Sequence, residues 1–144
     1  MSKILSNVQY KFLTTILILF SGISVIAQIN HWENLVSESN IWSYRLGNSE
    51  PPNNWYSTNF SSSTWATGSG GIGYGDGDDL TTISNTPSLY MRIEFNANQV
   101  QLMDALIFHA DYDDGFIAYL NGVEIARANV DTIIPAYNYS PAYD

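Results

Sequence analysis

The stretch that decides the fold is residues 116–128, FIAYLNGVEIARA, in which two apolar runs flank the pair Asn121-Gly122. Asn-Gly favours a type I′ turn, because both central residues of that turn need a positive φ and these two residues adopt it most easily. The sequence therefore predicts a β-hairpin with strands at 116–120 and 123–128. The preceding residues 113–115, Asp-Asp-Gly, are typical of the turn that starts such a hairpin.

Three further segments are typical of strands. Residues 88–95, SLYMRIEF, alternate with a period of two and predict a half-buried strand. Residues 41–46 and 106–110 predict two more strands; we expect the second to be buried and to follow a single helical turn near 100–104. No segment after Ala27 shows apolar residues at helical spacing over three turns, so we expect an all-β protein with only short helices. The inward face of the 88–95 strand is predicted to carry Leu89, Met91, Ile93 and Phe95.

The N-terminus has the layout of a secretory signal peptide. Lys3 and Lys11 precede a run of sixteen uncharged residues, FLTTILILFSGISVIA, that ends on small residues. The run is shorter than the roughly 20 residues needed to span a bilayer, so we favour a signal peptide over an uncleaved anchor. Cleavage after Ala27 would leave Gln28 first. We therefore expect residues 1–27 to be the signal peptide, and the protein to be secreted or on the cell surface without stable membrane insertion.

Composition excludes several classes of function. The 144 residues include 14 acids against 5 Lys and Arg, and the net charge is −9. Removing the predicted signal peptide removes both lysines, so three arginines then face fourteen acids and the net charge becomes −11. Nucleic acid is an unsuitable partner, because phosphate contacts need clustered Lys and Arg. The absence of cysteine excludes disulfides, thiolate zinc sites and cysteine nucleophiles.

The loop at residues 68–79, GSGGIGYGDGDD, matches the dinucleotide pattern GxGxxG at Gly68, Gly70 and Gly73. That pattern binds pyrophosphate only when a strand precedes it and a helix follows it. Here acidic residues follow instead, and they would repel phosphate. We therefore reject a dinucleotide site.

The acids of the same loop suit a calcium ion. Asp76, Asp78 and Asp79 offer hard oxygen ligands, and the glycines between them let the loop curl. The loop is not an EF-hand, because Pro87 stands where the twelfth-position acid would be. Two interpretations remain: solvated turn residues, or a structural calcium site with an affinity on the order of 10⁻⁴ to 10⁻³ M.

Other polar clusters give weaker signals. Asp111, Asp113 and Asp114 resemble the start of an EF-hand loop, but a strand follows them, so we favour a turn. The sequence contains two histidines, His31 and His109, and neither belongs to an HExxH motif or lies beside a nucleophile motif. The carboxylates Glu94, Asp111 and Glu124 are better explained as surface charges than as a glycosidase pair. We therefore expect this chain not to be an enzyme.

The segments EPPNNWYSTNFSSSTW, GSGGIGYGDGDDLTTI, SLYMRIEF and YDDGFIAYLNGVEIARAN resemble the galactose-binding-like jelly-roll module of secreted bacterial multidomain proteins. Such modules occur beside lamin-tail or spore-coat-protein-H-type kinase domains in cargo of the type IX secretion system. The resemblance covers about residues 42–129. It implies an antiparallel β-sandwich of eight strands in two sheets, with a non-catalytic role beside other domains, and it favours calcium.

The resemblance also implies that residues 28–144 are an incomplete module. Family members continue after the hairpin with further strands, whereas this chain ends on PAYNYSPAYD. We expect a C-terminally truncated sandwich with an exposed strand edge and exposed apolar side chains.

Two functions from different classes follow. The first is a non-catalytic binding or architectural module that recognises polysaccharide through aromatic rings. Candidate ligand-binding residues are Trp55, Trp65 and Tyr74, which either stack on sugar faces or pack in the core. The second is the N-terminal accessory part of a secreted enzyme, kinase-like or hydrolase, whose catalytic domain lies beyond residue 144. Downstream domains of the same polypeptide are partners in both cases.

Overall fold

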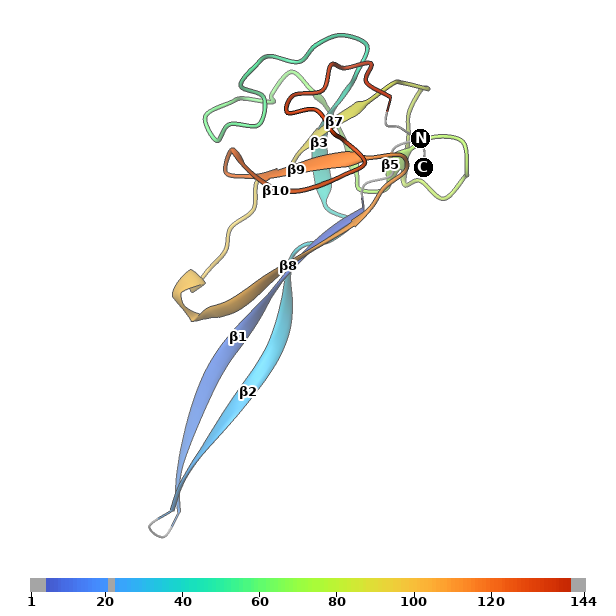
Figure 1. The fold of residues 1–144 in the computed structure, drawn as a ribbon. Coiled ribbons are helices and arrows are strands. Elements are labelled where there is room, and N and C mark those ends of the chain that lie inside the picture. The colour runs from blue at the N-terminus through green and yellow to red at the C-terminus, as the bar shows by residue number, and fades with distance from the viewer. Residues whose placement is uncertain (1–4, 21–22, 141–144) are drawn as a thin grey trace.

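The computed structural model describes the backbone of residues 5–20 and 23–140 and the side chains of residues 31–140. Within these residues the chain forms ten strands and one turn of 3-10 helix (Figure 1). All strand pairings there are antiparallel except the short pairing of β5 with β6. The expectation of an all-β protein is confirmed. The elements are β1 (Leu5–Phe20), β2 (Ile23–Val36), β3 (Ile41–Leu46), β4 (Ala66–Ser69), β5 (Ile72–Gly73), β6 (Thr81–Thr82), β7 (Leu89–Arg92), η1 (Val100–Leu102), β8 (Met103–Asp111), β9 (Phe116–Leu120) and β10 (Val123–Ala128).

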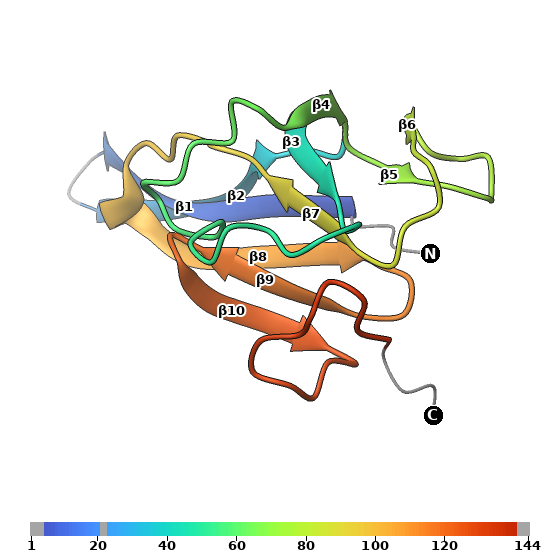
Figure 2. The same ribbon diagram turned by 90° about the horizontal axis from the view of Figure 1, so that it is seen from above.

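The predicted hairpin is confirmed as β9 and β10. Its two turn residues have positive φ, 51° at Asn121 and 82° at Gly122, as a type I′ turn requires. Leu120 pairs with Val123 directly across this turn. The chain after β10 turns back toward β9 (Figure 2). This return places the C-terminal segment beside the hairpin.

The buried core lies around β3, the central strand of the sheet β4-β3-β7. Among the described side chains, the buried apolar residues are Val36, Trp42 and Ile72. The strand predicted at 88–95 is shorter in the structure, where β7 covers only Leu89–Arg92. Its predicted inward face is confirmed, because Leu89, Met91, Ile93 and Phe95 pack against this core.

The strand predicted at 106–110 exists as part of β8, and the turn expected before it is η1. Its predicted burial is wrong. None of its side chains is buried, and Leu106 is 43% exposed. The reason is its position: within the described strands β8 pairs only with β1, whereas the buried apolar side chains all lie between Val36 and Ile72.

The predicted signal peptide, residues 1–27, covers β1 and the start of β2. In the full chain these two strands form a long antiparallel hairpin that projects from the other sheets (Figure 1). The strand order β2-β1-β8 places β1 in the middle of this sheet. Removal of residues 1–27 stays a prediction. No helix in the described part of the chain is long and apolar enough to cross a membrane.

Candidate functional site

A cavity of about 250 Å³ lies between four segments of the chain. These are the loop 50–56, residues 86–90 at β7, residues 113–119 at the start of the hairpin, and the C-terminal segment 130–139. Much of the wall consists of aromatic side chains. They are Trp55, Tyr56, Tyr90, Phe116, Tyr119 and Tyr139.

Trp55 is the centre of the aromatic wall. Its ring meets Tyr90 at a centroid distance of 5.1 Å and Tyr119 at 5.8 Å, both edge-on. Tyr56 stacks on Tyr119, with centroids 4.7 Å apart and planes 19° apart. Edge-on and offset aromatic pairs of this kind are attractive beyond the area they bury. Four of the six rings, from the loop, β7 and β9, are therefore in contact with one another.

The structure separates the three aromatic residues that the sequence suggested as ligand contacts. Trp55 lines the cavity. Trp65 does not line the cavity but packs against Trp55: the centroids of the two rings are 6.4 Å apart and their planes differ by 30°. Tyr74 follows β5 on the glycine-acid loop and is also outside the cavity lining. All three side chains are half-buried.

Arginines hold the loops that form the cavity walls. Arg92 donates through Nη1 to the carbonyls of Trp55 and Ser57, the latter at 3.0 Å, and through Nη2 to that of Phe60 at 3.3 Å. Its guanidinium also lies 5.3 Å from the centre of the Phe60 ring. Because all three acceptors are backbone oxygens, Arg92 fixes the path of residues 55–60.

Arg127 holds the C-terminal segment in the same way. It donates to both carboxylate oxygens of Glu124, at 2.5 and 2.7 Å. It also donates to the carbonyls of Val130 and Thr132, at 3.1 and 2.7 Å. Tyr137 donates its backbone N–H to the Glu50 carboxylate at 3.1 Å, which ties the C-terminal segment to the loop 50–56.

Burial acts on two tyrosines of the cavity wall. Burial raises the pKa of the Tyr90 phenol, and the nearby Glu50 charge adds to this effect. Burial and the Glu124 charge likewise raise the pKa of Tyr119. Both phenols are therefore neutral near pH 7 and can donate as well as accept hydrogen bonds.

Sequence reasoning missed Tyr90, Tyr119 and the C-terminal segment as parts of this site. Tyr90 and Arg92 alternate with the core-facing residues of their strand, and an aromatic and a cation on that second face were the available signal. The contribution of residues 130–139 depends on the return of the chain past β10. That return gives no local pattern.

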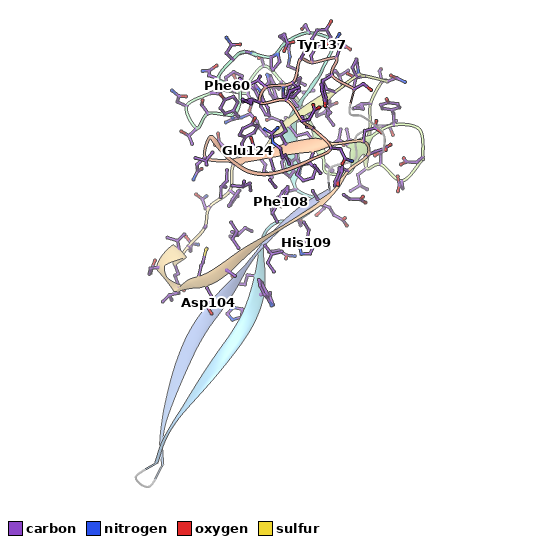
Figure 3. The ribbon with its side chains drawn as sticks, in the orientation of Figure 1. Phe60, Asp104, Phe108, His109, Glu124 and Tyr137 are labelled. Atoms are coloured by element: carbon purple, nitrogen blue, oxygen red, sulfur yellow. The ribbon has the colours of Figure 1, made fainter. Side chains whose placement is uncertain are left out.

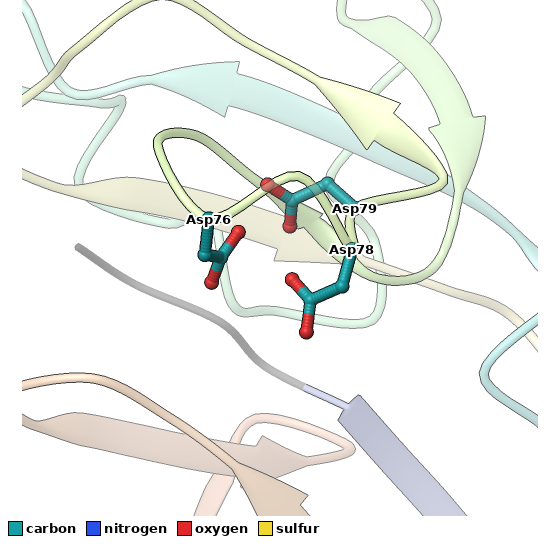
Figure 4. A group of neighbouring side chains, drawn as sticks. All are labelled: Asp76, Asp78 and Asp79. Carbon is teal, nitrogen blue, oxygen red and sulfur yellow. The ribbon is translucent and has the colours of Figure 1, made fainter.

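The aspartates of the glycine-acid loop do come together (Figure 4). One oxygen from each of Asp76, Asp78 and Asp79 lies within 4.8 Å of the others. Gly77 between them has a φ of 83°, and Gly73 leaves room for the Asp79 carboxylate, since a Cβ there would lie 2.5 Å from Asp79 Oδ1. Calcium takes six to eight oxygen ligands, so these three suit part of its shell.

The glycines that match the GxGxxG pattern allow neighbouring segments to pack closely against the backbone. A Cβ on Gly70 would lie 1.9 Å from the Glu38 carbonyl oxygen, and one on Gly68 would lie 2.6 Å from the Thr81 side chain. No helix follows them, because β5, a loop and β6 come next. The rejection of a dinucleotide site agrees with this geometry.

The second aspartate cluster forms the turn before β9. Asp114 has a φ of 69°, and Gly115 donates its N–H to the Asp113 carbonyl at 3.1 Å. The Asn129 side-chain amide donates to the Asp114 carbonyl at 2.7 Å, which ties the turn to the end of β10. The cluster thus acts as a turn, as the sequence predicted.

The histidines and the remaining acids are dispersed. His31 lies on β2 with Nε2 2.9 Å from the Glu33 carboxylate, whereas His109 is exposed on β8. Figure 3 shows Asp104 and His109 along β8, away from Phe60 and Tyr137.

Comparisons with protein-family models, with curated proteins and with solved structures gave no match. Functional proposals for this chain therefore rest on its own residues and geometry.

Proposed function

We propose that this chain is a secreted, non-catalytic β-sandwich module of the jelly-roll type that binds carbohydrate in the cavity beside Trp55. The observation that carries the proposal is the aromatic wall of this 250 Å³ cavity. Sugar rings present apolar C–H faces that pack on aromatic rings, and a connected set of rings offers such a surface. The resemblance to galactose-binding-like modules supports the non-catalytic β-sandwich part of the proposal.

Polar groups around the rings suit sugar hydroxyls. The lining includes the hydroxyl residues Thr86 and Ser88, the amide of Asn53 and the carboxylate of Glu50. A few polar groups among apolar walls are the usual composition of a small-ligand site, since they fix the orientation of the ligand. The tyrosine phenols add donors at two further positions.

A glycan array followed by calorimetric titration of the exported protein tests this proposal. We expect binding of at least one oligosaccharide class, and loss of that binding in Tyr119→Ala. Tyr74→Ala, outside the cavity, should bind as the parent does. Loss of binding in Tyr74→Ala with normal binding in Tyr119→Ala would contradict the location, and absence of any glycan binding would contradict the function.

Secretion is proposed from the signal-peptide layout of residues 1–27. N-terminal sequencing of the exported protein checks it, and Gln28 is the expected first residue. An exported protein that begins at Met1 would contradict the proposed cleavage.

We further propose Asp76, Asp78 and Asp79 as carboxylate ligands of a structural calcium ion. The support is their convergence within 4.8 Å and the hard-oxygen chemistry of the set. When bound, the ion would fix the loop between β5 and β6.

A further inference from the structure

The segments that line the cavity are joined to one another. The ring of Trp55 meets Tyr90 on β7 and Tyr119 on β9. In the same loop, the Glu50 carboxylate accepts the backbone N–H of Tyr137 at 3.1 Å. The loop that carries Trp55 and Glu50 is therefore tied to each of the other three wall segments.

The C-terminal segment is also joined to the turn before β9. The side-chain amide of Asn129, where this segment begins, donates to the carbonyl oxygen of Asp114 at 2.7 Å. The loop, the C-terminal segment and the hairpin thus form a closed ring of contacts. Proline fixes φ near −65°, which stiffens the backbone. Three positions of the wall are prolines, namely Pro51, Pro52 and Pro135.

The cavity has room for one sugar unit. Its volume is about 250 Å³. For scale, a protein cavity of about 150 Å³ holds benzene, a ring of six carbon atoms. By the same ratio this cavity takes about ten non-hydrogen atoms, close to the eleven or so of one hexose unit in a chain. Two linked units would need about twice the volume.

We infer that the cavity binds one terminal sugar unit, at the end of a chain or of a side branch, and not the interior of a long polysaccharide. This inference rests on the proposed carbohydrate function. An internal unit is linked to a neighbour at each of two positions, so its chain has to leave the site in two directions. A terminal unit has one link, so it can enter a cavity of this size while the rest of the chain stays in solvent.

Ligand length tests the inference by calorimetric titration of the exported protein. The probes are the methyl β-glycosides of galactose, glucose, mannose, xylose and N-acetylglucosamine, each beside the β-1,4-linked tetramer of the same sugar. Any further sugar that the glycan array identifies is added in the same two forms. For a sugar that binds, we expect the methyl glycoside to bind within about fivefold of the tetramer, because units outside the cavity add few contacts. A tetramer that binds more tightly than this margin, or that binds alone, would overturn recognition of a single unit but leave the carbohydrate function standing.

Tyr119→Ala tests whether the cavity makes the contacts with both forms of the sugar. It should abolish binding of the methyl glycoside and of the tetramer alike. Tyr74→Ala is the matched control, since Tyr74 lies outside the cavity lining, and it should leave both affinities unchanged. A tetramer that keeps its affinity in Tyr119→Ala would bind outside the cavity and would overturn the inference. Failure of every methyl glycoside and tetramer, and of every glycan on the array, would overturn the proposed function itself.

Discussion

The ring of Trp55 meets the ring of Tyr119 edge-on, with centroids 5.8 Å apart and planes at 86°. Trp55 belongs to a loop near the middle of the chain, and Tyr119 belongs to the hairpin strand β9. Their contact joins two segments that local sequence patterns describe separately. It forms the centre of the wall of the proposed binding cavity.

Replacing Trp55 removes this centre. Trp55→Ala should abolish glycan binding and lower the free energy of unfolding by about 2–4 kcal/mol, because the rings of Tyr90 and Tyr119 lose their shared partner. Urea unfolding and titration measure the two effects. Trp32→Ala is the control, since Trp32 is 46% exposed on β2 and does not line the cavity. Normal binding in Trp55→Ala would contradict the site.

Arg92 is a positioning residue for the loop 55–60. Arg92→Ala should cost about 2–3 kcal/mol, because three backbone carbonyls lose a charged donor. Amide hydrogen exchange should accelerate in residues 55–60 and stay unchanged in 130–136, which Arg127 holds. Arg92→Lys should recover little, since an ammonium group lacks the planar fork that reaches several acceptors. Full protection of residues 55–60 in Arg92→Ala would contradict this role.

The pair of Glu124 and Arg127 predicts a pH dependence. The hydrogen bonds from Arg127 hold the pKa of Glu124 below its ordinary value of 4.5. Because the pKa is lower in the folded state, ionised Glu124 stabilises the fold at pH values above its ordinary pKa. This contribution disappears as the pH falls through the lowered pKa. Glu124→Gln should therefore be less stable than the parent near neutral pH and equal to it in acid. A difference in urea midpoint that persists in acid would contradict this.

Calcium binding would depend on the position of Asp79. The full chain should melt at a higher temperature in millimolar calcium than in chelator, with a dissociation constant on the order of 10⁻⁴ to 10⁻³ M. Gly73→Ala should remove this shift, because the new Cβ would lie 2.5 Å from Asp79 Oδ1 and displace the carboxylate. Asp104→Asn should keep the shift. No calcium-dependent shift in the parent chain would eliminate the site.

Cleavage after Ala27 would change the partner of β8. The structure of the full chain pairs β8 with β1, and β1 lies within the predicted signal peptide. Hydrogen exchange in Met103–Asp111 should therefore be faster in the exported protein than in the full chain made without export. The β9 amides provide the internal control. Equal protection of β8 in both forms would show that residues after Ala27 replace β1 as its partner.

Local signals predicted the elements whose structure depends on a few neighbouring residues. The Asn121-Gly122 turn and the inward face of β7 were both correct, because positive φ and two-residue alternation are local properties. The exposure of Leu106 was not predicted, since burial depends on which layer covers a strand.

The candidate site was predicted only in part. Trp55 was identified as an aromatic candidate, but its partner Tyr119 and the return of residues 130–139 are tertiary features. Tyr74 was chosen on the same local grounds and lies outside the cavity. The identity of a ring was visible in the sequence, whereas the set of rings that share a wall was not.

The exposure of three apolar side chains on β10 and in the C-terminal segment also follows from tertiary structure. Val123 is 67% exposed on β10, and Ile133 and Ile134 are 85% and 78% exposed. Exposed apolar groups of this kind promote association. Their exposure agrees with the expectation of exposed apolar side chains, while the truncation of the module stays a prediction.

The most direct test of the proposed carbohydrate site is the indole N–H signal of Trp55 in a ¹H–¹⁵N spectrum of the full chain, assigned by its loss in Trp55→Ala. Titration with an oligosaccharide that binds on the glycan array should move this signal progressively to saturation, while the signals of Trp32 and Trp42, which lie outside the cavity, stay in place. A Trp55 signal that does not move when the oligosaccharide is bound, or that moves no more than those of Trp32 and Trp42, would contradict the account.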